Sequence, residues 1–75
     1  MKKKIFITGG SGFIGREVVR LLADKNKYKI TSLVRTPVQK PENNVEYVIG
    51  DILDIKSFRK YAEQADIILH MAALI

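Results

Sequence analysis

The sequence predicts an α/β fold built on a mostly parallel sheet. Short runs of β-branched and aromatic residues alternate along the 75 residues with segments of helical periodicity. A glycine-rich stretch lies at the first junction between such a run and such a segment. Strands that alternate with helices need crossover connections, and right-handed crossovers place the first strand centrally. We therefore expect four strands in the spatial order 3-2-1-4.

The first half of the chain contains two predicted strands and one predicted helix. Residues 4–8 and 30–34 are rich in β-branched residues, and glycines end the first run. The helix is predicted over residues 12–25, with Asn26 as its stop. Its apolar residues recur with the period of one helix face, which we expect to pack on the sheet. These residues are Ile14, Val18, Leu21 and Leu22.

The second half is predicted to hold two more strands and a second helix. Residues 36–44 contain two prolines and two asparagines, which indicates a loop without a helix. Residues 45–49 form the third predicted strand. Asp54 is placed to cap a helix over residues 55–65, and the fourth strand is predicted over residues 66–72.

Composition excludes several classes of protein. The chain has no cysteine and one histidine, which excludes a disulfide scaffold and gives no support to a metal site. No apolar run approaches the ~18–20 residues of a membrane span. The apolar run after the first lysines is too short for a signal peptide, so we expect a cytoplasmic protein. The net charge is +5, but the basic residues are spread out, and we expect a solvated surface with no nucleic-acid partner.

The strongest chemical signal is the segment Thr8-Gly9-Gly10-Ser11-Gly12-Phe13-Ile14-Gly15. Glycines between a strand and a helix allow a tight turn, close approach of the backbone to a pyrophosphate, and close packing of helix on strand. The helix N-terminus offers free N–H groups to phosphates. Spacing permits either Gly10 or Gly9 as the first glycine, followed by Gly12 and Gly15. The alternative is a glycine-rich turn that binds nothing.

A second signal follows the second strand. NAD-binding proteins usually have an acidic residue about 20 residues after the glycine motif, and it binds the ribose 2′-hydroxyl. Arg35 lies 20 residues after Gly15, while Asp24 falls in the helix and Glu42 in the loop. An arginine there can pair with a 2′-phosphate, so NADP is favoured, and Thr36 could add a hydroxyl. The alternative is a solvated strand end.

Two further strand ends carry candidate residues. Asp51 is predicted to accept a hydrogen bond from an adenine amino group, with Ile52 packed on the ring, unless the carboxylate merely closes a turn. Small Ala72 and Ala73 would let the backbone approach a cofactor beyond the fourth strand. His70 precedes them, and we expect a structural role for it.

Together these motifs resemble the extended short-chain dehydrogenase/reductase family of NAD(P)-dependent epimerases, dehydratases and reductases. The matching segments are residues 8–15, 50–54 and 70–73. The resemblance implies a Rossmann-like fold and selects Gly9 as the first glycine of the motif. It implies cofactor contacts in three places: Gly12, Phe13 and Ile14 at the pyrophosphate, Asp51 and Ile52 at the adenine, and Ala72 and Ala73 near the ribose and pyrophosphate.

The sequence departs from the family pattern in two respects. Arg35 stands where NAD-using members have an acid, as in NADP-using reductases. The Tyr-x-x-x-Lys pair of the family does not occur in these residues. The resemblance therefore implies that residues 1–75 are the N-terminal part of an NAD(P)-binding Rossmann domain, without the catalytic and substrate-binding parts and inactive alone. The alternative is a stand-alone nucleotide-binding or sensing module without catalysis.

The predicted fourth strand has a further consequence. Its apolar residues Ile67 to Met71 would form an uncovered sheet edge in a chain of this length. Exposed apolar edges favour pairing between chains. We expect a homodimer or larger assembly through this strand.

Overall fold

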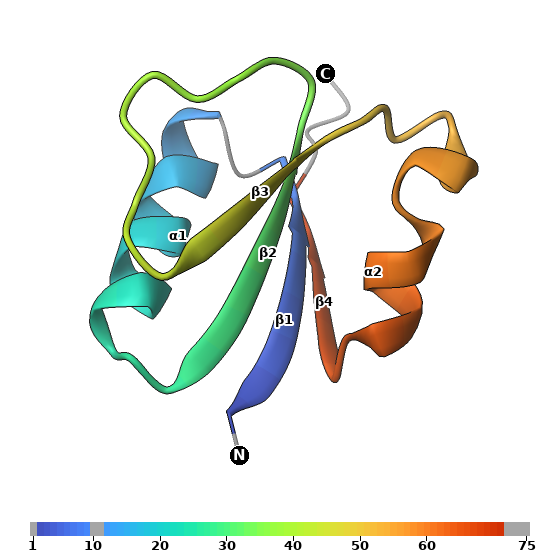
Figure 1. Cartoon of the computed structure of the whole chain (residues 1–75). Coiled ribbons are helices and arrows are strands. Elements are labelled where there is room, and N and C mark those ends of the chain that lie inside the picture. Colours follow the sequence, from blue (N-terminus) through green and yellow to red (C-terminus); the bar gives the residue numbers. More distant parts are fainter. Residues whose placement is uncertain (1, 10–11, 72–75) are drawn as a thin grey trace.

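The computed structural model describes residues 2–9 and 12–71. Within these residues the chain forms strands, two α-helices and a short 3₁₀ helix, η1 (Figure 1). In chain order they are β1 (Lys3–Thr8), α1 (Phe13–Asp24), β2 (Tyr28–Val34), β3 (Val45–Ile49), η1 (Ile55–Ser57), α2 (Arg59–Gln64) and β4 (Ile67–His70).

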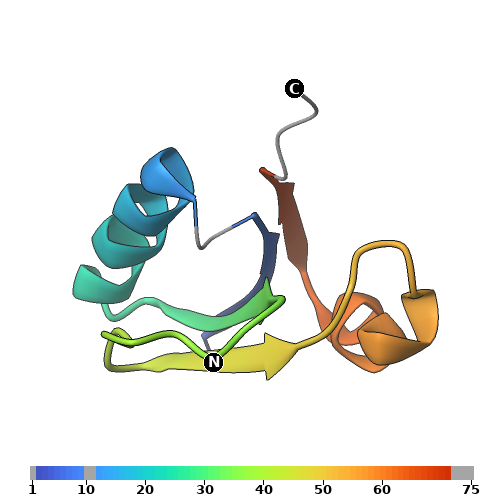
Figure 2. The same ribbon diagram turned by 90° about the horizontal axis from the view of Figure 1, so that it is seen from above.

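The strands form one parallel sheet in the order β3-β2-β1-β4, which confirms the predicted order and the Rossmann-like fold class. The two α-helices cover opposite faces of the sheet, α1 on one side and α2 on the other (Figure 2). Every strand runs in the same direction, so all four C-terminal ends lie at one edge. That edge carries the candidate site.

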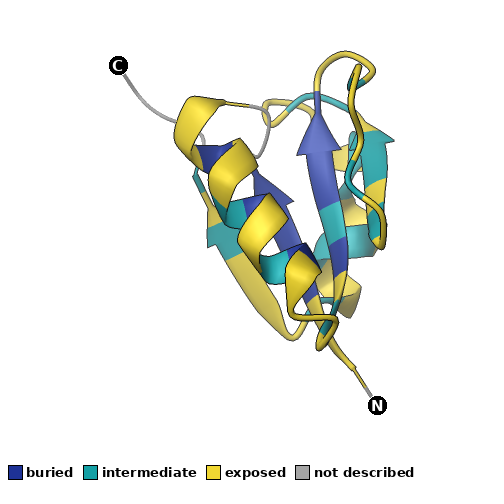
Figure 3. Cartoon of the chain, turned by 90° about the vertical axis from the view of Figure 1, so that its left-hand side faces the viewer, coloured by how far each residue is buried: buried dark blue, intermediate teal, exposed yellow. Residues whose placement is uncertain are grey.

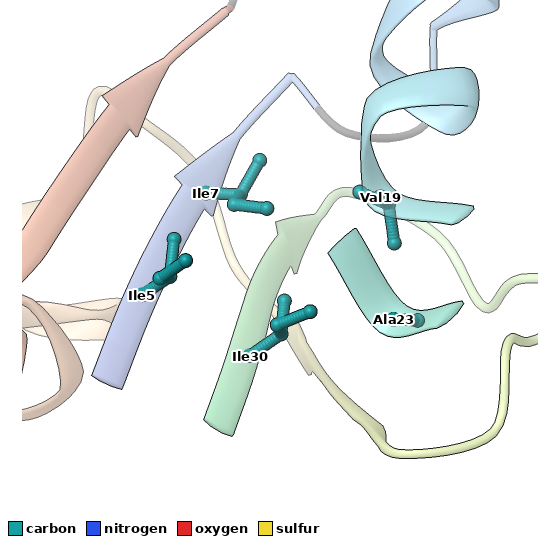
Figure 4. Close-up of a cluster of buried hydrophobic side chains, with 5 residues drawn as sticks. All are labelled: Ile5, Ile7, Val19, Ala23 and Ile30. Atoms are coloured by element: carbon teal, nitrogen blue, oxygen red, sulfur yellow. The ribbon is translucent and has the colours of Figure 1, made fainter. Parts of the chain in front are cut away.

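The core lies between α1 and the two central strands (Figure 4). Ile5 and Ile7 of β1 and Ile30 of β2 are each at most 3% exposed. Val19 and Ala23 of α1 pack against them. On the other face, the ring of Phe6 stacks on the ring of Phe58, with centroids 5.7 Å apart.

The predicted buried face of α1 is wrong. The observed buried face is rotated about the helix axis relative to the predicted one. Ile14 is 72% exposed and Leu21 is 53% exposed, while Val18 and Leu22 are half-buried. The buried positions of the helix recur every four residues and are Gly15, Val19 and Ala23. Two of these three residues are small, which lets the helix axis approach the sheet closely. The helix therefore packs through its small residues rather than through its bulkiest apolar stripe.

The predicted second helix is interrupted. Residues 55–65 form η1, then Phe58 with φ −140° and ψ −2°, then α2. Ser57 explains part of the break, because its hydroxyl bonds to the carbonyl oxygen of Asp54 at 2.6 Å. Asp54 caps η1, as predicted for the start of this segment, by accepting from the N–H of Lys56.

The predicted strand boundaries differ from the observed ones by up to two residues. β2 begins at Tyr28 rather than residue 30, because Tyr28 pairs with Lys3 in the parallel ladder. Pairing thus extends the strand beyond its apolar run. α1 ends at Asp24, and Asn26 adopts φ 52°, as expected of a stop residue. Within the described ranges, no helix is long and apolar enough to cross a membrane.

Candidate dinucleotide-binding edge

The candidate residues that the structure describes gather along the C-terminal edge of the sheet, at the upper end of Figure 1. β1 leads into the glycine turn, β2 into Arg35, and β3 into Gly50 and Asp51. β4 ends at His70. Ligands of open α/β sheets bind beyond this edge, so the fold brings the predicted residues to the expected place.

The glycine turn after β1 leads into the first turn of α1. Gly9 adopts φ 77°, a left-handed conformation that glycine tolerates best. The N–H of Gly12 donates to the carbonyl oxygen of Gly9 at 3.4 Å. Gly12 caps α1 without any side-chain hydrogen bond, and the N–H of Arg16 donates to its carbonyl at 2.8 Å. Gly10 and Ser11 lie outside the described residues.

The start of α1 fits an anionic group. Because the helical ladder begins at Arg16, the N–H groups of Phe13 and Ile14 have no acceptor among the described residues. The first turn carries no acid, so nothing there opposes the positive end of the helix dipole. A Cβ atom at Gly12 would lie 3.7 Å from the carbonyl oxygen of Gly9, which is ordinary van der Waals contact. These features suit the pyrophosphate of a dinucleotide.

Arg35 directly follows the last residue of β2 and is exposed. Its neighbour Thr36 is also exposed. No carboxylate of the described residues lies within salt-bridge distance of Arg35. The guanidinium therefore stands at the candidate edge and makes no ion pair with the described residues. Its position at the strand end was predicted, while its pairing with a 2′-phosphate stays a prediction.

Asp51 belongs to a hydrogen-bonded loop after β3. Its Oδ1 atom accepts from the N–H of Leu53 at 2.9 Å, so the carboxylate does close a turn. Its N–H donates to the Ser57 hydroxyl oxygen at 3.1 Å. The other carboxylate oxygen has no hydrogen bond within the described chain and is available to a ligand. Ile52, beside it, is 40% exposed.

Two features of this loop were missed at the level of sequence. A Cβ atom at Gly50 would lie 2.6 Å from the Ser57 hydroxyl oxygen and 2.9 Å from a Leu33 methyl carbon. Gly50 is thus needed for close packing, and Ser57 is the residue that organises the loop. No signal in the sequence linked them, because their contact depends on the path of the loop.

Thr8 and His70 form a second missed contact. The Thr8 hydroxyl oxygen lies 2.6 Å from Nδ1 of His70, at paired ends of β1 and β4. The predicted strand order, taken with the two strand ends, was the signal that could have found it. Ala72 and Ala73 lie outside the described residues. The described ranges hold no group of three metal-ligating side chains.

A groove of about 650 Å³ runs beside α1, between the helix and the loop before β3. Phe13, Arg16 and Lys40 are among its lining residues, and Arg35 is not. Arg20 also lines the groove, but it donates a 2.6 Å hydrogen bond to Glu17. That bond raises the pKa of Arg20 above its ordinary value. Arg16 and Lys40 thus line the groove together with the carboxylate of Glu42, and the groove reaches the start of α1.

This fold and edge define a Rossmann-type nucleotide-binding unit. The family model described as "NAD dependent epimerase/dehydratase family" matches residues 5–75. The chain belongs to this family. Membership supports a nicotinamide dinucleotide as the cofactor.

The curated relatives are much longer than this chain. It is 33% identical over 73 residues to the UDP-glucose 4-epimerase of Vibrio cholerae, covering 97% of this chain and 22% of that protein. It is 35% identical over 74 residues to the ceramide reductase of Caulobacter vibrioides, covering 95% of this chain and 23% of that protein. The chain therefore spans less than a quarter of the length of either relative.

Solved structures agree with the fold. A Rossmann-fold NAD(P)-binding family protein from Shigella flexneri superposes with a TM-score of 0.87 at 30% identity, over 99% of this chain and 39% of that chain. The dTDP-glucose 4,6-dehydratase of Bacillus anthracis, solved in complex with NAD, gives a TM-score of 0.72 at 26% identity, over 96% of this chain and 27% of that chain.

Proposed function

We propose that residues 1–75 are the N-terminal part of an NAD(P)-binding Rossmann domain and hold the dinucleotide of an NAD(P)-dependent epimerase, dehydratase or reductase. The start of α1 carries this proposal. A glycine with φ 77° leads to a cap without a side-chain bond, and backbone donors without acceptors follow it. This arrangement suits a pyrophosphate.

The remaining cofactor contacts follow from the order of the strand ends. In this proposal Gly9, Gly12 and Gly15 form the turn, and the backbone of Phe13 and Ile14 completes the pyrophosphate contact. A second group of residues contacts other parts of the dinucleotide. It comprises Asp51 and Ile52 at the adenine, and Ala72 and Ala73 near the ribose and pyrophosphate.

We further propose that the cofactor is NADP. Arg35 supports this preference, because it is exposed after β2 and no described carboxylate pairs with it. A guanidinium at this place makes bidentate hydrogen bonds to a 2′-phosphate, which NAD lacks. An acid, the usual partner of the NAD ribose, would repel that phosphate.

The chemistry of the whole protein is hydride transfer, which a bound nicotinamide supplies. The residues present here position that group and do not include a Tyr-x-x-x-Lys pair. We therefore propose that the 75 residues bind cofactor without turnover. The second candidate is a nucleotide-sensing module, favoured by the fact that the glycine turn, Arg35 and Asp51 all lie within this short chain. A longer reading frame with Tyr-x-x-x-Lys would exclude it.

Calorimetric titration of the folded chain with NADP and with NAD tests the cofactor. We expect saturable binding that favours NADP. Arg35→Ala should lower NADP affinity by about 10- to 100-fold, since hydrogen bonds to charged groups contribute about 1.5–3 kcal/mol. NAD affinity should stay unchanged.

Lys29→Ala is the matched control, because it removes a positive charge from the opposite end of the same strand, about 20 Å away. That distance exceeds the screening length at physiological salt. Equal affinity for the two dinucleotides would overturn the NADP preference. Failure of the folded chain to bind either one would overturn the binding proposal.

We also propose that the chain self-associates through β4. Ile67 and Ile68 are 37% and 55% exposed, and only β1 pairs with β4 within the described residues. Light scattering should report a dimer or larger species at high concentration. Ile68→Lys should give a monomer, because a charge on an edge strand opposes pairing between chains. A monomeric wild-type mass would overturn the proposal.

A further inference from the structure

The ends of β1 and β4 are joined by two hydrogen bonds at one position. The N–H of Met71 donates to the carbonyl oxygen of Thr8 at 2.8 Å. Beside it, the Thr8 hydroxyl and Nδ1 of His70 lie 2.6 Å apart. Thr8 and His70 are register partners, so the side-chain bond continues the ladder to the edge of the sheet.

The side-chain bond falls where the β1 backbone changes direction. Thr8 is 3% exposed and is the last residue of β1. Gly9 follows with φ 77°, and its carbonyl accepts from Gly12. A buried hydroxyl without a partner is costly, so the Thr8 side chain is held in the orientation that reaches His70. The bond therefore constrains the residue from which the glycine turn starts.

We propose that His70 is a positioning residue. Through the Thr8 hydroxyl, it fixes the end of β1 and so the geometry of the Gly9 turn. Either neutral tautomer makes the bond: an unprotonated Nδ1 accepts from the hydroxyl, and a protonated Nδ1 donates to it. His70 does not act on substrate in this role. The consequence for dinucleotide affinity rests on the proposed function, whereas the effect on the turn does not.

The primary test follows the glycine amides in the ligand-free chain by nuclear magnetic resonance. Thr8→Val keeps the shape of the side chain and removes the hydroxyl. We expect amide exchange at Gly12 to accelerate roughly three- to tenfold, in line with the loss of one hydrogen bond. Thr8→Ser retains the hydroxyl and should restore exchange to within about twofold of wild type.

Two controls separate positioning from general loss of stability. Thr31→Val makes the same substitution in β2, where the Thr31 hydroxyl has no side-chain hydrogen bond among the described residues. It should leave Gly12 exchange unchanged. His70→Leu should reproduce the effect of Thr8→Val, and the double variant should be no worse than either single one. Additive effects, or equal acceleration in Thr31→Val, would overturn the proposal.

Titration with NADP tests whether the Thr8 hydroxyl also affects dinucleotide affinity. Thr8→Val should weaken binding by about three- to tenfold, and Thr8→Ser should not. If the wild-type chain binds no dinucleotide, the proposed function fails while the exchange data still decide the positioning role. If Thr8→Val leaves Gly12 exchange at the wild-type rate, the positioning role fails whatever the affinity.

Discussion

The half of the chain that contains β1, α1 and β2 is buried far more deeply than the half that contains β3, η1, α2 and β4. Every buried residue that the structure describes lies in the first half, and Figure 3 shows the buried segments in dark blue on α1 and on the central strands next to it. They are Ile5, Phe6, Ile7, Thr8, Gly15, Val19, Ala23, Ile30, Ser32, Leu33 and Val34.

The difference follows from the strand order. β1 and β2 have neighbours on both edges, while β3 and β4 are the outer strands of the described sheet. α1 has twelve residues and packs closely, whereas α2 has six and buries none of them. The glycine turn is therefore attached to the best-packed elements, and the Asp51 loop and His70 approach it from the less buried half. A binding site gains precision from such a rigid base.

The sharpest test of this comparison places the same substitution in each half. Ile7→Ala removes a side chain that is fully buried, and it should lower the free energy of unfolding by about 2–5 kcal/mol. Ile68→Ala, at a position that is 55% exposed, should lower it by less than about 1 kcal/mol. Urea denaturation followed by circular dichroism measures both.

Ile7→Val is the milder companion and should cost about 0.5–1.5 kcal/mol, which keeps the transition measurable if Ile7→Ala unfolds the chain. Equal costs for Ile7→Ala and Ile68→Ala would show that β4 is as well packed as β1. The physical cause would be self-association that buries the β4 edge.

The sequence was sufficient for the fold class and the strand order, because both depend on patterns within single segments. It did not reveal which face of α1 is buried. Small residues on that face let the helix approach the sheet. A prediction based on the positions of large apolar residues overlooks Gly15 and Ala23. It also missed the break at Phe58, whose backbone leaves the helical conformation at φ −140° and ψ −2° while its ring stacks on Phe6.

The candidate site was predictable to the extent that it consists of strand ends. The positions of Gly9, Arg35 and Asp51 at the sheet edge follow from topology alone. The contacts that hold them were not predictable. Ser57 reaches back to the Asp51 loop, and His70 reaches Thr8 across 62 residues of sequence. Such contacts depend on three-dimensional paths that no local pattern encodes.

Glycines in the two halves should respond differently to a methyl group. Gly50→Ala would place a Cβ atom 2.6 Å from the Ser57 hydroxyl oxygen and should cost about 1–3 kcal/mol in the free energy of unfolding. Gly12→Ala would place its Cβ atom 3.7 Å from the Gly9 carbonyl oxygen, which is ordinary contact, and should cost less than about 1 kcal/mol. Thermal denaturation compares the two variants.

Gly50→Ala in a Ser57→Gly background identifies which neighbour causes the loss of stability. Its cost should shrink there, because both Ser57 atoms that crowd the new methyl group are gone. An unchanged cost would assign the strain to the Leu33 methyl carbon at 2.9 Å instead.

The smallest expected effect reverses the usual relation between burial and stability. Ser32 is fully buried in β2, yet its hydroxyl has no hydrogen-bond partner among the described residues. Ser57 lies in the less buried half, yet its hydroxyl accepts from the N–H of Asp51 and directs its one proton at the carbonyl oxygens of Asp51 and Asp54. Ser32→Ala should leave the free energy of unfolding unchanged or raise it by up to about 1 kcal/mol, because it removes an unsatisfied buried group. Ser57→Ala should lower it by about 1 kcal/mol.

If urea denaturation instead shows that Ser32→Ala is the more damaging change, the Ser32 hydroxyl has a partner in solution, and the buried half is held by a polar contact as well as by apolar packing.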